Sequence, residues 1–226
     1  TGGVDMSWIS LDDETTGNPL GIGSNLTFAG SGELDNGWTV DLSVADTNAA
    51  VYSNTNVTVG IPGLGDFRIS QGVSGSGIDR MDDVTPNVWE EAYGTGLGTG
   101  INTVGGVSGS SNIEFTPNMM PDGLTARIAY SPNVGGSAAA DNAASAGQGP
   151  KGSGYDITLE MSDAMTGASG LSIGAGYSST DQDQTNTLYN GDVDEQTFYA
   201  TYAVAGFTLG YQWSEEDLGT ASNELS

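Results

Sequence analysis

Hydrophobic and polar residues alternate with a period of two along most of this chain. The clearest example is residues 38–46, whose apolar positions are Trp38, Val40, Leu42 and Val44. A period of two places successive side chains on opposite faces of an extended backbone. The alternation therefore predicts β-strands that each have one apolar face and one polar face.

Eleven segments carry this pattern, and turn residues separate them. The segments are residues 4–10, 25–33, 38–46, 55–61, 66–72, 111–116, 123–131, 155–162, 171–177, 198–204 and 207–213. Short connections alternate with longer ones, and the longest, residues 73–110, joins the fifth and sixth segments. Short turns at one end of a sheet and long loops at the other are typical of bacterial membrane barrels. The fold class that the pattern favours is all-β, a transmembrane antiparallel β-barrel.

The apolar face has a second interpretation, because it could instead cover the core of a soluble β-sandwich. Two observations favour lipid. The opposite face is small and polar rather than charged, and aromatic residues stand near strand ends, as they do at membrane interfaces. These aromatic residues are Trp38, Tyr130, Tyr177 and Trp213.

The composition of the chain excludes several classes of function. The formal net charge is −25, from 29 acidic and four basic residues. A nucleic-acid-binding protein needs a basic surface, so this class is excluded. The chain has no cysteine and no histidine, which excludes cysteine nucleophiles, Cys/His metal sites and Ser-His-Asp triads. Only a pair of acids is left for acid–base chemistry, and we expect no enzymatic activity.

The connection formed by residues 73–110 contains most of the candidate functional residues. It is rich in Gly and Ser and contains a compact charged stretch, with Asp79, Arg80, Asp82, Asp83, Glu90 and Glu91. A loop of this length inside a regular β pattern is generally either functional or disordered. Trp89 and Tyr93 lie within the acidic stretch, and such aromatic anchors favour an ordered, functional loop.

At this loop the sequence resembles a known family. Residues 65–132 contain a strand, a long loop with the core DRMDDVTPNVWEE, a strand, a short turn and a further strand. This order is similar to that of the general porins of Gram-negative outer membranes, and most similar to their α-proteobacterial branch. In that family the loop between the fifth and sixth strands folds into the barrel and narrows the pore. The resemblance assigns this role to residues 73–110.

The resemblance also implies the surroundings of the protein. General porins are sixteen-stranded barrels, usually homotrimers, that lie in the outer membrane among lipid and lipopolysaccharide. They pass ions and small hydrophilic solutes by diffusion. Residues 1–226 would then be a single domain holding about eleven of sixteen strands, since barrels of this kind use even strand numbers. We expect a partial mature chain, with the remaining strands beyond Ser226.

Two arginines are the sharpest site candidates. Arg68 and Arg127 lie in the polar phase of strands that flank the loop. An arginine facing lipid costs about 2–4 kcal/mol at mid-membrane, so the lumen is their natural position. The five acids of the loop would oppose them and set a transverse field, which predicts a cation-preferring pore. Arg80 either pairs with a neighbouring acid or lines the pore, and both roles stay open.

Four further acids share the lumenal phase and would extend the negative potential. They are Asp41, Glu114, Asp156 and Glu160. No cofactor is expected, although carboxylate oxygens suit Ca²⁺ and calcium at the acidic loops stays an alternative. The candidate positions are the acids of residues 73–110, residues 12–14, Asp181 with Asp183, and residues 192–195. No EF-hand spacing is present.

The alternative function is a secreted acidic adhesin or surface-layer protein. Such a protein would share the richness in Gly, Asn, Thr and Asp and the lack of cysteine. It would not need alternating short and long connections, or a long loop between the fifth and sixth strands. These two features favour the channel.

Overall fold

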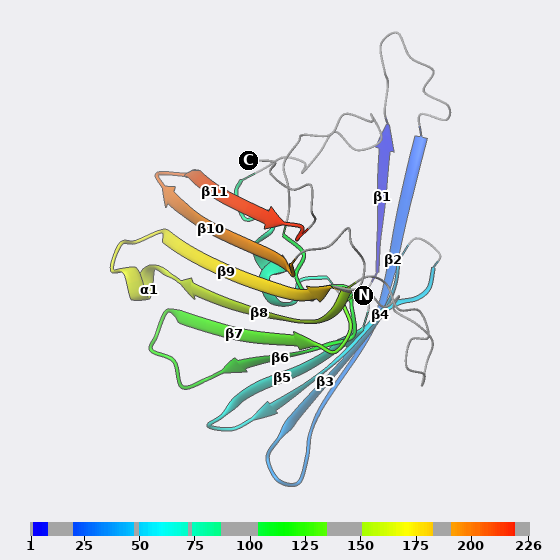
Figure 1. The fold of residues 1–226 in the computed structure, drawn as a ribbon. Helices are drawn as coiled ribbons and strands as arrows, with labels where there is room; N and C mark the ends of the chain where they lie inside the picture. The colour runs from blue at the N-terminus through cyan, green and yellow to red at the C-terminus, as the bar shows by residue number, and fades with distance from the viewer. Residues whose placement is uncertain are drawn as a thin grey trace.

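The computed structural model describes seven stretches of the chain: residues 2–8, 20–47, 50–71, 74–86, 104–134, 151–182 and 191–219. They form one antiparallel sheet whose eleven strands follow chain order (Figure 1). The strands are β1 (Gly2–Trp8), β2 (Leu20–Glu33), β3 (Thr39–Thr47), β4 (Ala50–Ile61), β5 (Gly65–Gln71), β6 (Asn112–Pro117), β7 (Leu124–Ser131), β8 (Lys151–Met161), β9 (Leu171–Gln182), β10 (Val193–Val204) and β11 (Phe207–Asp217). Two helical turns accompany them, η1 (Gly77–Met81) and α1 (Asp163–Thr166).

The sheet is curved, and five of its turns lie together along one end (Figure 1). These turns join β2 to β3, β4 to β5, β6 to β7, β8 to β9 through α1, and β10 to β11. In the described residues β1 pairs only with β2 and β11 only with β10, so the sheet is not closed there. No helix in this part of the chain has the length and apolar character to cross a membrane.

One face of the sheet is apolar and exposed. The alternation is clear on β7, where Ile128 is 55% exposed and its neighbour Ala129 is 0% exposed. Large exposed side chains continue this face on other strands, and they include Phe28, Ile69, Leu159, Phe198 and Leu209. The predicted two-faced strands are therefore confirmed, and within the described residues the apolar stripe covers no protein core.

The buried apolar side chains lie on the opposite, inner face. Four of them belong to the connection between β5 and β6, namely Ile78, Met81, Val104 and Val107. Ala129, Val193 and Tyr199 complete the set from β7 and β10. The packed core of the described protein therefore lies between this connection and the sheet.

Several strands are longer than their apolar stretches. The predicted segments 38–46 and 55–61 leave a connection of about eight residues, 47–54, and this prediction is wrong, because β4 begins at Ala50 and Thr47 already lies opposite it. Strand β9 likewise continues through the polar residues 178–182, and β10 includes the polar residues 194–197. The hydrogen-bond ladder needs only backbone groups, so it persists where the apolar pattern ends.

Candidate functional site: the inner wall and the inward-folded loop

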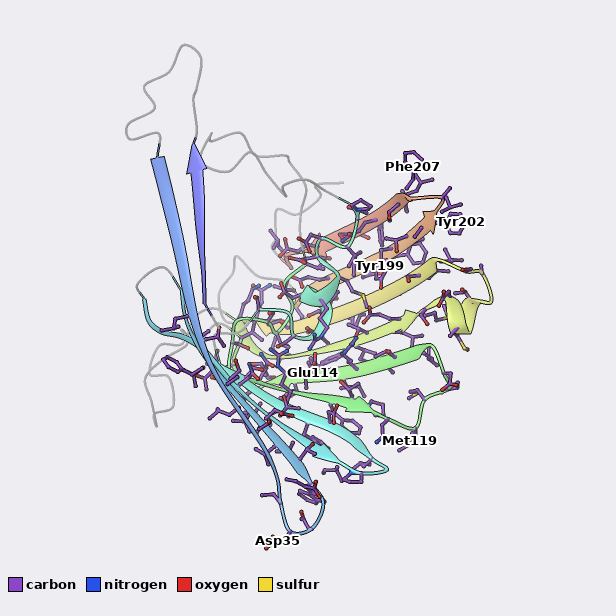
Figure 2. The ribbon with its side chains drawn as sticks, turned by 180° about the vertical axis from the view of Figure 1, so that it is seen from behind. Asp35, Glu114, Met119, Tyr199, Tyr202 and Phe207 are labelled. Atoms are coloured by element: carbon purple, nitrogen blue, oxygen red, sulfur yellow. The ribbon has the colours of Figure 1, made fainter. Side chains whose placement is uncertain are left out.

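The described parts of the β5–β6 connection, residues 74–86 and 104–111, include segments that lie on the inner face of the sheet. Helix η1 packs against β8, β9 and β10, and Figure 2 shows it on the same side of the sheet as Glu114 and Tyr199. Glycines in the wall make room for the connection. A Cβ on Gly176 would lie 2.7 Å from Cγ1 of Ile78, and one on Gly210 would lie 2.6 Å from Cδ of Pro86.

A row of carboxylates crosses the wall beneath the loop. Glu114 on β6, Asp156 on β8 and Glu195 on β10 fall in one register row, separated by the small residues Ala129 and Ser178. Adjacent strands are about 4.8 Å apart, so these acids are spaced by about 10 Å. Their side chains are buried, at 2%, 0% and 5% exposure.

Each of these carboxylates accepts hydrogen bonds from backbone N–H groups of the loop. Glu114 accepts from Gly77 at 2.7 Å. Asp156 accepts from Ile78 at 3.0 Å and from Val107 at 3.2 Å. Glu195 accepts from Gly105 at 3.1 Å and also from Gly106. Buried charges are tolerated when they are hydrogen-bonded, so the wall acids hold the loop by its backbone.

Glycine is required where the loop meets Asp156. Gly77 and Gly106 have φ values of +57° and +52°, which are strained for residues with a side chain. A Cβ on Gly77 would lie 1.9 Å from Oδ2 of Asp156, and one on Gly106 would lie 2.3 Å from the same atom. The close approach therefore depends on the absence of a side chain at both positions.

The three arginines lie in the described lumenal wall and loop, and all three are engaged. Arg80 forms an ion pair with Glu114 on β6, with Nε 3.2 Å from Oε2, so its partner is a wall acid and not a neighbour in the acidic run. Arg68 donates from Nη1 to the carbonyl of Gly75 at 3.0 Å. Arg127 pairs with Glu160 on β8.

The acids of the loop differ in their hydrogen bonds and in their exposure. Asp79 accepts from the hydroxyl of Ser108 at 2.7 Å and from the backbone N–H of Gly75, so it joins the two described parts of the loop. Asp83 is exposed, whereas Asp82 is half-buried. Glu90 and Glu91 lie outside the described residues. The arrangement of all five acids across a pore therefore stays a prediction.

Two site residues were missed by sequence reasoning. Gln212 on β11 donates to the carbonyls of Met81 and Asp82 at 2.6 and 2.8 Å and accepts from Val84 N–H at 3.2 Å. Glu195 appeared only as a calcium candidate. The signal that would have found Glu195 is its register with Glu114 and Asp156, which requires the strand pairing.

Tyr199 on β10 extends the polar contacts of the wall. Its hydroxyl donates to Oε2 of Glu160 at 3.0 Å, while Oε1 of the same glutamate faces Arg127. Within the described stretches, no three acidic, histidine or cysteine side chains form a group that could hold a metal ion. Residues 12–14 and Asp183 lie outside those stretches, so calcium there stays untested.

A family model described as Gram-negative porin matches residues 1–225. The chain belongs to the Gram-negative porin family. The predicted family is thus confirmed, and the protein is an outer-membrane porin of Gram-negative bacteria. Its sheet forms part of the wall of a transmembrane β-barrel. The apolar face of the sheet contacts lipid, and the inner face lines the lumen.

Solved porin structures align with this porin at low identity. A mutant of Rh. blastica porin aligns with 15% identity and a TM-score of 0.41, over 96% of this chain and 85% of that chain. A triple mutant of Rhodopseudomonas blastica porin aligns with 14% identity and a TM-score of 0.35, over the same shares of the two chains. No curated protein matched in a sequence search. The assignment rests on the family model.

The outer face of the porin has the height of a membrane band. On β10 the apolar side chains run from Phe198 to Val204, which spans about 20 Å at 3.3 Å per residue, close to the roughly 25 Å of outer-membrane barrels. At the edge of this band away from the short turns, the rings of Tyr155 and Tyr177 lie 6.2 Å apart. The Tyr177 hydroxyl donates to Asp194 at 2.9 Å, so the surface becomes polar there, as at a membrane interface.

Proposed function

We propose that this porin forms a water-filled, cation-preferring channel for passive diffusion of ions and small hydrophilic solutes. The observation that carries the proposal is the loop itself. Its described parts are fixed to the lumenal wall by Glu114, Asp156, Glu195 and Gln212. A loop held in this position reduces the cross-section of the lumen, so residues 73–110 form the constriction.

Charge supports the cation preference. The formal net charge is −25, and two of the three described arginines of the lumen are paired with acids. Arg80 pairs with Glu114 and Arg127 with Glu160. A pore lined by an excess of acids over basic residues raises the local concentration of cations. Asp79, Asp82, Asp83, Glu90 and Glu91 belong to the constriction loop and contribute to this negative lining.

The proposed assembly is a homotrimer embedded in lipid with lipopolysaccharide around it. The support is the family, together with the exposed apolar face that a membrane must cover. No chemical step is needed for transport, because the solute only exchanges part of its water for polar wall groups. We propose no cofactor.

The experiment that tests this function is conductance of the purified porin in a planar lipid bilayer. We expect stepwise, ohmic openings and, under a KCl gradient, a reversal potential that corresponds to a cation-to-anion permeability ratio above one. The preference should weaken when the salt is raised from 0.1 M to 1 M, because the Debye length falls from about 10 to about 3 Å.

Two results would count against the proposal. An anion preference would remove the assigned role of the acidic lining while leaving the channel in place. A protein that stays soluble without detergent and never inserts would contradict the channel itself and favour the secreted acidic surface protein.

A further inference from the structure

Gln212 on β11 both donates hydrogen bonds to the loop backbone and accepts one from it. Its Nε2 lies 2.6 Å from the carbonyl oxygen of Met81 and 2.8 Å from that of Asp82. Its Oε1 accepts from the N–H of Val84 at 3.2 Å. A reversed amide would set its oxygen against two carbonyl oxygens, so these three contacts fix the orientation of the side chain.

The chemistry of the amide suits the end of η1. Met81 is the last residue of this helical turn, and Asp82 follows it. The last carbonyls of a helix have no partner inside the helix, and acidic side chains at this end are unfavourable next to their partial negative charge. Gln212 supplies the missing donors. The carboxylates that hold the rest of the loop could not do so, because an ionised carboxylate only accepts hydrogen bonds.

The neighbouring lumenal position of β11 completes a seat for the loop. A Cβ on Gly210 would lie 2.6 Å from Cδ of Pro86 and 3.1 Å from Cγ2 of Thr85, so these two residues pack directly on the strand. The backbone is therefore held against β11 on both sides of Asp83. Asp83 itself is exposed, and in the described part of the chain it accepts no hydrogen bond and forms no ion pair.

This seat is separate from the row of buried carboxylates. Gln212 lies opposite Tyr199, which is four residues along β10 from Glu195. At about 3.3 Å per residue the two holding points are about 13 Å apart along the strand. The carboxylates bind the backbone of residues 77–78 and 105–107. Loss of the Gln212 amide would thus free the end of η1 and leave those contacts in place.

We infer that Gln212 is a positioning residue for ion selectivity. Its amide holds residues 81–84 against β11 and thereby fixes the start of the acidic stretch, Asp82 and Asp83, at the constriction. A fixed charge close to the ion path acts at short range, whereas a charge on a freed segment is spread over a wider passage and is screened by salt. This inference rests on the proposed function as a cation-preferring pore.

The test is the reversal potential of Gln212→Met under a KCl gradient. Methionine keeps the length of the side chain but has no amide donors. The cation-to-anion permeability ratio should fall about twofold at 0.1 M salt, and open-channel noise should rise. The matched control is Asn56→Leu. It removes a lumenal amide from β4 that, within the described residues, makes no hydrogen bond to the loop, so the ratio and the noise should stay unchanged.

A disulfide supplies a rescue in the same bilayer. The chain has no cysteine, so Thr85→Cys and Gly210→Cys introduce one thiol pair into the Gln212→Met porin. A Cβ on residue 210 would lie 3.2 Å from Cα of Thr85, which brings the two Cβ atoms near the 3.5–4.5 Å typical of a disulfide. Oxidation should restore the ratio and quiet the channel, because the bond returns the segment to its seat. Reduction should reverse both changes.

The outcomes separate this inference from the proposed function. A cation-preferring pore whose ratio and noise are unchanged by Gln212→Met would overturn the role of Gln212 and leave the channel intact. A loss that the disulfide does not reverse, or that Asn56→Leu reproduces, would overturn it as well. An unsubstituted pore without cation preference would contradict the proposed selectivity and the selectivity role of Gln212 with it. The noise alone then decides whether Gln212 holds the loop.

Discussion

Glu114, Asp156 and Glu195 share the lumenal phase with small polar residues, yet their surroundings differ from those of Asp41. Sequence alternation places Glu114, Asp156 and Asp41 on the lumenal face, and the structure confirms this face and adds Glu195 to it. The alternation does not give the register between strands. Without this register, the acids would be interpreted as equal contributors to the negative potential of the lumen. In the structure Glu114, Asp156 and Glu195 instead hold the loop.

The glycines that meet Asp156 offer a test at the residue scale. Gly77→Ala should displace η1, because the new Cβ would overlap Oδ2 of Asp156 and the φ of +57° is unfavourable for alanine. We expect faster protease cleavage in residues 74–86 and greater open-channel noise in the bilayer.

The matched control for this variant is Gly75→Ala. Gly75 also has a positive φ, +71°, but its added Cβ meets nothing within 4 Å. It should therefore show only the backbone strain of about 1–2 kcal/mol and keep the loop in place. Equal protease sensitivity of the two variants would contradict the close contact with Asp156.

At the scale of the elements, the strands and their faces were predictable because alternation follows from which side meets lipid and which meets water. Strand ends were less predictable. The β3–β4 connection is short because Thr47 and Ala50 pair beyond the apolar stretch. The position of the loop could be expected only from the family resemblance, because its anchors come from β6, β8, β10 and β11, far apart in the sequence.

The lipid-facing surface gives a test of strand orientation. Leu159→Arg places a charge on the outer face of β8, where Leu159 is 43% exposed, and should destabilise the folded barrel by about 2–4 kcal/mol. Unfolding by urea in lipid vesicles measures this change in free energy.

The depth control is Leu64→Arg, in the turn between β4 and β5. A charge near the interface costs only about 0–1 kcal/mol, so this variant should unfold close to the unsubstituted porin. A loss as large for Leu64→Arg as for Leu159→Arg would mean that the apolar band does not mark the membrane interior.

At the scale of the whole molecule, the described sheet, the loop on its inner face and the excess of acids combine into a charged passage. Charge composition could be read from the sequence directly, since four basic residues stand against 29 acids. The distribution of that charge could not, because it depends on which acids the loop covers. The sixteen-strand total stays a prediction of the family resemblance.

The most direct test of the central claim, that the loop lies on the lumenal wall, is a disulfide between Ile78→Cys and Gly176→Cys. A Cβ on residue 176 would lie 2.7 Å from Cγ1 of Ile78, so the two Cβ atoms fall within reach of a disulfide, whose Cβ atoms are about 3.5–4.5 Å apart. The control pair is Ile78→Cys with Gly30→Cys, because Gly30 shares the outer face of β2 with Phe28. We expect mild oxidation to link residues 78 and 176 in the folded porin, as read by mass spectrometry, with conductance retained and no link in the control pair. Free thiols at both positions after oxidation, or a link that forms equally well to residue 30, would contradict the placement of the loop.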